Sequence, residues 1–330
     1  MRGALALAAL GISAGGCASF EDPAVVIDLR VLAMTATPPE QVVDVDLEAP
    51  DPLAILDQLA ETEVAALVAD PGANRPLRWS MTLCRYDGNR CGRERPYVEL
   101  GAGVIDDPDL APVAQIPRAS IVPGAHGDVV LALVRDALED NPVEALGGVQ
   151  LTVELVVGDV TDRSTDIYAA KHVRLSPRIP AQRAANQNPR VNRVDAARVG
   201  GATFELRQRA RCAELEARGE TIPIARPGDR ITLYPDEHEA ARETYVVPTL
   251  DGGTAELKET LTYQWLTTHG SWSDDFTGGG RDPLGNQSLL GSDWIAPRSV
   301  SGPVLASLWM IQRDERFGVS WYETCLRIVP

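Results

Sequence analysis

The stretch "LRWSMTLC", residues 77–84, decides the fold class of this chain. Its apolar and polar residues alternate strictly: Leu77, Trp79, Met81 and Leu83 are separated by Arg78, Ser80 and Thr82. Such alternation is typical of a β-strand that buries one face and exposes the other. The turn cluster "DPGANRP", residues 70–76, comes directly before it and gives the strand a defined start.

A second stretch, "LTYQWL", residues 261–266, has the same character, with Leu261, Tyr263 and Trp265 on one face. In both stretches a tryptophan lies near the middle of the strand. Immunoglobulin-like sandwiches place a tryptophan in this way, where it fills the space between the two sheets. Further short β-rich stretches with turn signals between them surround both. We therefore predict a mainly all-β chain with tandem immunoglobulin-like β-sandwich domains.

The length and composition agree with two domains, since 330 residues with 44% hydrophobic content can fill two cores. We predict an N-terminal domain over residues 25–176, a polar, proline-bearing linker over 177–190, and a C-terminal domain over 191–330. Apolar residues recur at helical spacing near 128–140, which predicts a helical insertion in the first domain. The proline-bearing stretch 92–127 is expected to be irregular.

The first residues have the pattern of a secretory signal peptide over 1–16: one positive charge, a short apolar run and then small residues. The apolar run is too short to span a membrane, which needs about 20 residues. "AGGC" resembles the lipobox of bacterial lipoproteins, which implies cleavage before Cys17 and fatty acylation of that residue. That family usually has Leu where this chain has Ala14. An ordinary signal peptide cut a few residues later is the alternative.

Lipidation of Cys17 would make residues 17–24 a short tether to a membrane, and two or more acyl chains anchor a protein stably. Ala18 follows the cysteine instead of Asp, which resembles the outer-membrane sorting signal of Gram-negative lipoproteins. We expect the outer membrane as the location, with a body that is periplasmic or at the cell surface. The net charge of −16 would repel phosphate backbones, so nucleic-acid binding is not expected.

The remaining four cysteines are an even number in a chain that is predicted to leave the cytoplasm, so we expect disulfides. Cys84 and Cys91 flank an Asp-Gly-Asn sequence, and a tight turn there would place them opposite each other. Cys212 and Cys325 would then pair by elimination. A zinc site is the competing use of four cysteines, although the sequence has no C-x-x-C pair.

Several stretches together resemble a group of secreted lipoproteins of myxobacteria and their relatives. The resemblance is carried by "IDLRVLAMTATPPE", "LRWSMTLC", "NQNPR" in the linker, "YVVPTLDGGTAELKETLTYQWL" and "LWMIQRDERFGVSW". It covers most of residues 17–330 and implies immunoglobulin-like or PKD-like sandwich domains. That group brings no established activity, so the resemblance supplies no catalytic residue.

The sequence lacks the H-E-x-x-H, G-x-S-x-G, P-loop and dinucleotide-binding motifs. No enzyme and no organic cofactor are therefore expected. A weak candidate for structural calcium is the acidic group Asp274, Asp275 and Asp282, with solvated acidic loops as the alternative. Trp272 and Trp294 flank the glycine-rich stretch "TGGGRDPLGNQ" and are candidate ligand contacts if exposed, or core residues if buried.

The first functional hypothesis is a lipid-anchored cell-envelope protein with a structural, adhesion or scaffolding role, which contacts the membrane and envelope proteins or polysaccharide. The second is a carbohydrate- or peptide-binding module that uses the aromatic loops of the C-terminal domain. The third, an envelope hydrolase, requires His238 or His269 beside an acid and a serine. Exposure of the two tryptophans would separate the first hypothesis from the second.

Overall fold

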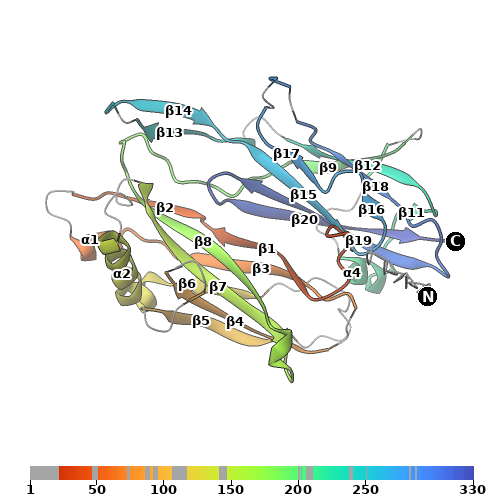
Figure 1. The fold of residues 1–330 in the computed structure, drawn as a ribbon, viewed down its shortest axis with the longest axis horizontal. Helices are drawn as coiled ribbons and strands as arrows, with labels where there is room; N and C mark the ends of the chain where they lie inside the picture. Colours follow the sequence, from red (N-terminus) through yellow and green to blue (C-terminus); the bar gives the residue numbers. More distant parts are fainter. Residues whose placement is uncertain are drawn as a thin grey trace, which may run out of the picture.

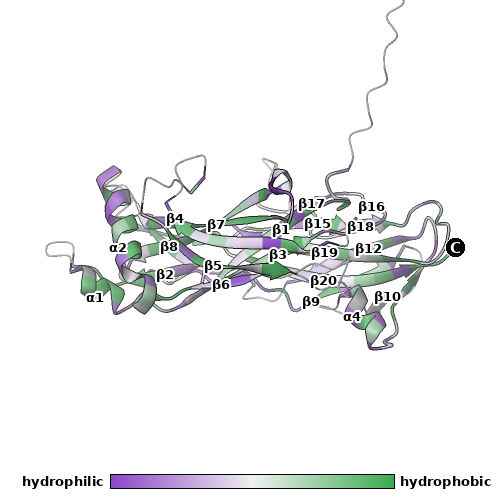
Figure 2. Cartoon of the chain, turned by 90° about the horizontal axis from the view of Figure 1, so that it is seen from below, coloured by the Kyte–Doolittle hydropathy of each residue, from purple (hydrophilic) through white to green (hydrophobic). Residues whose placement is uncertain are grey.

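The chain forms two β-sandwiches, which confirms the predicted fold class (Figure 1). Strands β1 to β8 build the N-terminal sandwich and β9 to β20 the C-terminal one, and together they make an elongated body (Figure 2). The computed structural model describes residues 22–330 apart from 47–50, 73–74, 86–89, 92–95, 106–116, 141–146, 200, 202, 206–210, 238–240, 250, 282–283 and 287.

Two sheets face each other in the N-terminal sandwich. The larger has the strand order β2 (Glu40–Val43), β8 (Ile167–Pro177), β7 (Val149–Asp159), β4 (Leu77–Cys84) and β5 (Val98–Ile105). The smaller has the order β1 (Arg30–Thr37), β3 (Thr62–Ala69) and β6 (Arg118–Ile121). The short helix η2 (Arg163–Thr165) connects β7 to β8. As the alternation in β4 predicts, Leu77, Met81 and Leu83 are buried in the core, and Trp79 packs against it partly buried.

The expectation of an irregular stretch over 92–127 is wrong, because β5 and β6 both lie within it. β5 pairs with β4, and β6 pairs with β3. The ring of Trp79 covers Gly101 and Gly103 of β5, and a Cβ at Gly103 would lie 3.0 Å from Trp79 Nε1. Cross-strand pairing and packing decide strand formation here, and local propensity does not.

Two helices lie at one end of the N-terminal sandwich (Figure 1). α2 (Pro123–Asp140) spans the range in which the helical insertion is predicted, and it buries one face: Gly127, Val130, Leu133 and Ala137. α1 (Pro52–Leu56) begins after Asp51, whose carboxylate accepts a hydrogen bond from Leu53 N at 2.9 Å as an N-cap. The apolar periodicity of α2 therefore has its physical cause in packing against the sheet.

The C-terminal sandwich has two five-stranded sheets. One has the order β11 (Ile224–Ala225), β20 (Val319–Ile328), β19 (Val304–Asp314), β15 (Leu261–Thr267) and β17 (Phe276–Gly278). The other has the order β10 (Thr203–Glu205), β9 (Arg193–Arg198), β12 (Arg230–Asp236), β18 (Ser292–Ile295) and β16 (Ser271–Trp272). A hairpin of β13 (Thr244–Pro248) and β14 (Thr254–Lys258) and the helix α4 (Cys212–Ala217) complete it. Tyr263, Trp265 and Trp294 fill its core with no exposed surface.

Both expected disulfides form, Cys84–Cys91 and Cys212–Cys325, with Cα–Cα separations of 5.5 Å and 5.2 Å. The second ties α4 to β20 across a sequence separation of 113 residues. Paired cysteines of this kind indicate an oxidising compartment. In the part of the chain that the structure describes, no helix has the length and apolarity needed to cross a membrane.

The two sandwiches meet through β3, which is buried on both faces. One face belongs to the N-terminal core, and the other belongs to a separate apolar cluster. That junction cluster combines residues of both sandwiches: Val26, Leu32, Ala33, Leu67, Ala69, Leu266, Trp309, Ile311 and Val319. Burial of this contiguous apolar surface holds the domains against each other.

Candidate functional site

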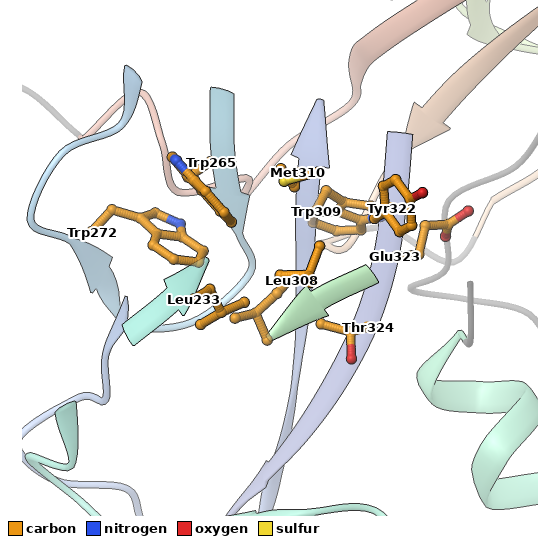
Figure 3. Close-up of a pocket in the computed structure, with 10 residues that line it drawn as sticks. Leu233, Trp265, Trp272, Leu308, Trp309, Met310, Tyr322, Glu323 and Thr324 are labelled. Carbon is orange, nitrogen blue, oxygen red and sulfur yellow. The ribbon is translucent and has the colours of Figure 1, made fainter. Parts of the chain in front are cut away.

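The structure buries both tryptophans that were predicted as ligand contacts. Trp272 is 8% exposed and Trp294 is not exposed at all. Trp272 lies beside Trp265 with ring centroids 5.2 Å apart, and Leu233 and Leu308 surround a cavity of only about 20 Å³ next to them (Figure 3). The prediction of an aromatic contact surface is wrong here because both indoles fill the space between the sheets.

The other predicted site residues do not converge. Asp274 is exposed and accepts a hydrogen bond from Ser273 Oγ at 3.1 Å, and Asp275 is partly buried. Among the residues that the structure describes, no acidic, histidine or cysteine group is arranged to hold a metal ion. Cys17, His238 and Asp282 lie outside the described residues. His269 pairs through Nδ1 with Thr268 Oγ1 at 3.1 Å, and burial lowers its pKa.

A buried ion network crosses the domain junction at the tip of the β19–β20 hairpin. Arg316 at this tip donates to Glu40 Oε2 at 2.8 Å and lies 3.4 Å from Glu259 Oε1. Glu40 belongs to β2, and Arg183 of the linker lies 2.9 Å from its other oxygen. Glu40 is 1% exposed and Arg316 8% exposed. The network therefore joins both sandwiches and the linker away from water.

Three carboxylates face Arg316, since Glu243 Oε2 also lies 3.7 Å away, and two of them, Glu40 and Glu259, have pKa values shifted in opposite directions. Burial acts to raise the pKa of Glu40, but hydrogen bonds from Ser176 Oγ and Asn186 N and the two guanidinium groups outweigh it, so the pKa is lowered. For Glu259, burial and the charge of Asp314 prevail and raise the pKa to about 7. Glu40 is thus firmly ionised at neutral pH, whereas Glu259 is poised between its two states.

Phe317 follows Arg316 and docks on β8. Its φ of 77° lies in the left-handed region, which residues other than glycine rarely adopt. The ring meets His172 edge-on with centroids 5.6 Å apart, and the Arg174 guanidinium lies 4.7 Å from its centroid. Contacts from the N-terminal sandwich thus hold a strained turn of the C-terminal one.

A groove of about 560 Å³ runs beside β20 at this junction. Its floor is one face of the small N-terminal sheet, and its walls are β20, the linker and the start of α4. The lining residues are Thr35, Thr37, Glu63, Ala65, Arg118, Asn188, Arg190, Arg211, Glu214, Val319, Ser320, Trp321, Tyr322 and Glu323.

The ionic groups of the groove are mostly paired. Arg118 forms an ion pair with Glu63, and Arg211 lies 3.7 Å from Glu323. Arg190 is exposed and forms no ion pair with any described residue. Glu214 lies 3.8 Å from Arg211 as well, so Arg190 is the one lining arginine without an ion pair to a described residue.

The groove also exposes a strand edge. The backbone of β20 alternates between bonding to β19 and pointing outward. Val319 points outward: its N–H donates to Asn188 Oδ1 at 3.0 Å, and its carbonyl accepts from Thr35 Oγ1 at 2.6 Å. In the same outward phase, the backbone N–H and C=O groups of Trp321 and Glu323 have no hydrogen-bond partner among the described residues. Such an edge is a template for another strand.

A second pocket, of about 330 Å³, lies between β1, β8 and the β19–β20 hairpin. Its walls are Val31, Leu32, Ala33, Met34, Ala169, Ala170, Lys171, His172, Arg313, Asp314, Phe317, Gly318 and Val319. Lys171 is 5% exposed and donates a hydrogen bond to the carbonyl of Phe317. Burial lowers the pKa of Lys171 to about 8.

Sequence reasoning did not identify these junction residues, although three signals were present. "NQNPR" and "RDERFG" were noted only as a linker and a turn, yet they supply Asn186, Asn188, Arg190 and Arg316. Lys171 was also detectable, because the sequence has only two lysines. No local sequence pattern shows that the β19–β20 turn, the linker and β8 lie together in the folded protein.

No protein-family model matches the chain, and no curated protein matches it. Among solved structures, it is similar to red sea bream transglutaminase, with 10% identity over 91% of this chain and 31% of that one, at a TM-score of 0.22. The chain thus spans about a third of that transglutaminase chain.

Two other solved structures are similar over most of their own length. The tandem V-type regions of the chitin-binding protein VCBP3 give 8% identity over 91% of this chain and all of that one, at a TM-score of 0.23. The C-terminal domain of BspA from Streptococcus agalactiae gives 10% identity over 81% of this chain and 92% of that one, at a TM-score of 0.18. At these scores the likenesses carry no argument about activity, ligand or partner.

Proposed function

We propose that the protein is a lipid-anchored scaffold of the bacterial cell envelope, without catalysis, that holds an extended segment of an envelope partner on the edge of β20. The observation that carries this proposal is the unpaired edge of Trp321 and Glu323 inside the junction groove. A strand added there would gain backbone hydrogen bonds, and the side chains that line the groove would contact its side chains.

Rigidity supports a scaffolding role. The junction cluster and the Glu40–Arg316 network couple the two sandwiches through both apolar and ionic contacts. The groove is built from both sandwiches and the linker, so its shape depends on their fixed arrangement. A preformed groove loses little conformational entropy when a ligand binds, which favours affinity.

The charge of the groove favours an acidic segment. Arg190 lines the groove without an ion pair to a described residue, and a carboxylate of the partner would pair with it. The carboxylates of Glu63 and Glu323 already face arginines. The occupant we propose is therefore an extended peptide with an acidic residue, supplied by another envelope protein.

The anchor supports the location. Acylation of Cys17, which lies outside the described residues, would make the predicted stretch 17–24 a tether. Ala24 is already buried in the C-terminal core at 1% exposure. Val25 N donates to Asp22 O at 2.9 Å in a turn, so at most residues 17–21 can extend, and five extended residues reach about 18 Å. A body on so short a tether would stay next to the bilayer, as a scaffold for envelope partners requires.

The test uses the mature chain and a library of end-capped hexapeptides that carry one Asp or Glu among β-branched residues. We expect selected peptides to lose binding when N-methylated at the positions that face β20, and to retain it when methylated at the alternate positions. Arg190→Glu should weaken binding at least tenfold, while Arg163→Glu, an equal charge change on the distant η2 turn, should not. Failure of the whole library to bind, or equal effects of the two methylation phases, would overturn the proposal.

A further inference from the structure

The second pocket concentrates positive charge in an otherwise acidic chain. Lys171 and Arg313 both line it, and neither forms an ion pair with a carboxylate of the described residues. Arg313 instead donates to Gln264 Oε1 at 2.9 Å and to the carbonyl of Leu32. With 47 acidic and 31 basic residues in the sequence, two unmatched cations at one pocket need a physical reason.

Asp314 balances only one of these two cations, because it is a single carboxylate and forms no ion pair with either of them among the described residues. It is the one carboxylate of the lining, and its oxygens accept hydrogen bonds from Arg316 N and Gly318 N at 2.7 Å each and from Asn186 Nδ2 at 3.2 Å. The hairpin turn thus uses Asp314 for its own backbone. The pocket keeps an excess of positive charge.

The ammonium group of Lys171 has donors to spare. One N–H reaches the Phe317 carbonyl, and an ammonium group has three. A buried cation with unmatched donors costs free energy unless a counter-ion satisfies it. The only other lysine in the sequence, Lys258, is exposed on β14, which makes the burial of Lys171 specific to this site.

The wall that β1 contributes to the second pocket is apolar. β1 has a bulge between Val31 and Ala33, and consecutive residues from Val31 to Met34 line the pocket there. Bulges are enriched beside binding sites because they redirect side chains. The volume of about 330 Å³ is at the lower end of the range for small-molecule sites.

From this geometry we propose that the pocket binds a small aliphatic carboxylate, whose head lies between Lys171 and Arg313 and whose chain packs on Val31 and Met34. Phe317 and the hairpin tip close one side of the site, so both sandwiches contribute to it. The pocket shares only Val319 with the groove along β20, and the ligand is of a different class. This site is independent of the peptide-binding function.

Carboxylate binding at this site should depend on pH, because it requires the protonated form of Lys171. The charges that act on Lys171 are those of Asp314 and Arg313 on the hairpin; His172 of β8 lines the same pocket and is itself affected by Lys171 and Arg174, whereas Val31 to Met34 of β1 carry no charge. Burial and the neighbouring cations lower the pKa of His172, which favours its neutral form. Lys171 loses its proton from about pH 8 upward, which removes half of the cationic pair.

Calorimetric titration of the mature chain with butanoate, hexanoate and octanoate at pH 7 tests the site, with hexanamide as the neutral match. We expect saturable binding of at least one carboxylate and none of the amide. Lys171→Met should weaken binding at least tenfold, whereas Lys258→Met, the other lysine, should leave it unchanged. Binding to the unaltered protein should also weaken between pH 7 and pH 9.5, which needs no variant to fold. Equal binding of hexanamide, no binding of any carboxylate, or no pH dependence would overturn the proposal.

Discussion

Replacing Arg316 by Met would test whether the ion network couples the two sandwiches. Met keeps the aliphatic length of the side chain but removes the charge that faces Glu40 at 2.8 Å and Glu259 at 3.4 Å. Breaking a buried ion pair by removal of one partner costs about 3–5 kcal/mol. Two features reduce that cost here. Arg183 still pairs with Glu40, and Glu259 can take up a proton because its pKa is already about 7.

We therefore expect Arg316→Met to lower the free energy of unfolding by about 3 kcal/mol at pH 8, with a smaller loss at pH 6. At pH 6 Glu259 is largely protonated with or without the arginine, so less charge is left unpaired. Urea unfolding followed by tryptophan fluorescence at both pH values measures the two losses. Glu40→Gln and the double variant complete a cycle that isolates the Glu40–Arg316 coupling. A loss below about 1 kcal/mol at pH 8, or equal losses at both pH values, would refute the reasoning.

Four further predictions concern Glu259, the second disulfide, Trp294 and Cys17. The pKa of Glu259 is raised in the folded state, so the folded protein binds this proton more tightly than the unfolded chain does. The free energy of unfolding should therefore fall by up to about 3 kcal/mol as pH rises from 4.5 to 7. Glu259→Gln should flatten this pH dependence of the urea midpoint, and an unchanged dependence would contradict the prediction. Replacing Cys212 and Cys325 together by Ser should lower stability by about 4–5 kcal/mol, because the bridge closes a long loop; a loss under 1 kcal/mol would argue against the bridge. Trp294→Ala should cost about 3–5 kcal/mol, since the indole is fully buried; a stable variant with lost glycan binding would restore the contact role. Cys17→Ser should move the protein from membrane to aqueous fractions, and mass spectrometry should find acyl groups on the native residue; an unmodified thiol would exclude the anchor.

The β19–β20 hairpin at the junction has four roles. Its tip carries Arg316 for the ion network and Phe317 for docking on β8. Its second strand offers the unpaired edge beside the groove, and Arg313 on its first strand lines the small pocket. Changes at the tip should therefore alter the small pocket, which Phe317 lines, whereas changes in either core should act mainly through stability.

Local patterns predicted the elements whose environment repeats along the chain. Alternation in residues 77–84 predicted β4, because a strand that packs on one core must repeat every two residues. The helical spacing near 128–140 predicted α2 for the equivalent reason at a period of 3.6. The sequence did not predict β5, because Gly101 and Gly103 have no apolar side chain to produce an alternating pattern. Their strand is instead stabilised by the ring of Trp79, which packs over both glycines.

The sequence by itself determined the fold class, the helix and both disulfides, because periodicity, turn residues and an even set of cysteines act locally or by count. Only the tertiary structure decided that Trp272 and Trp294 are buried and that the candidate sites lie at the domain junction. A glycine-rich flank does not reveal on which side of a sheet an indole lies. Lys171 and Arg313 are 142 positions apart in the sequence, and only domain docking places them around one pocket.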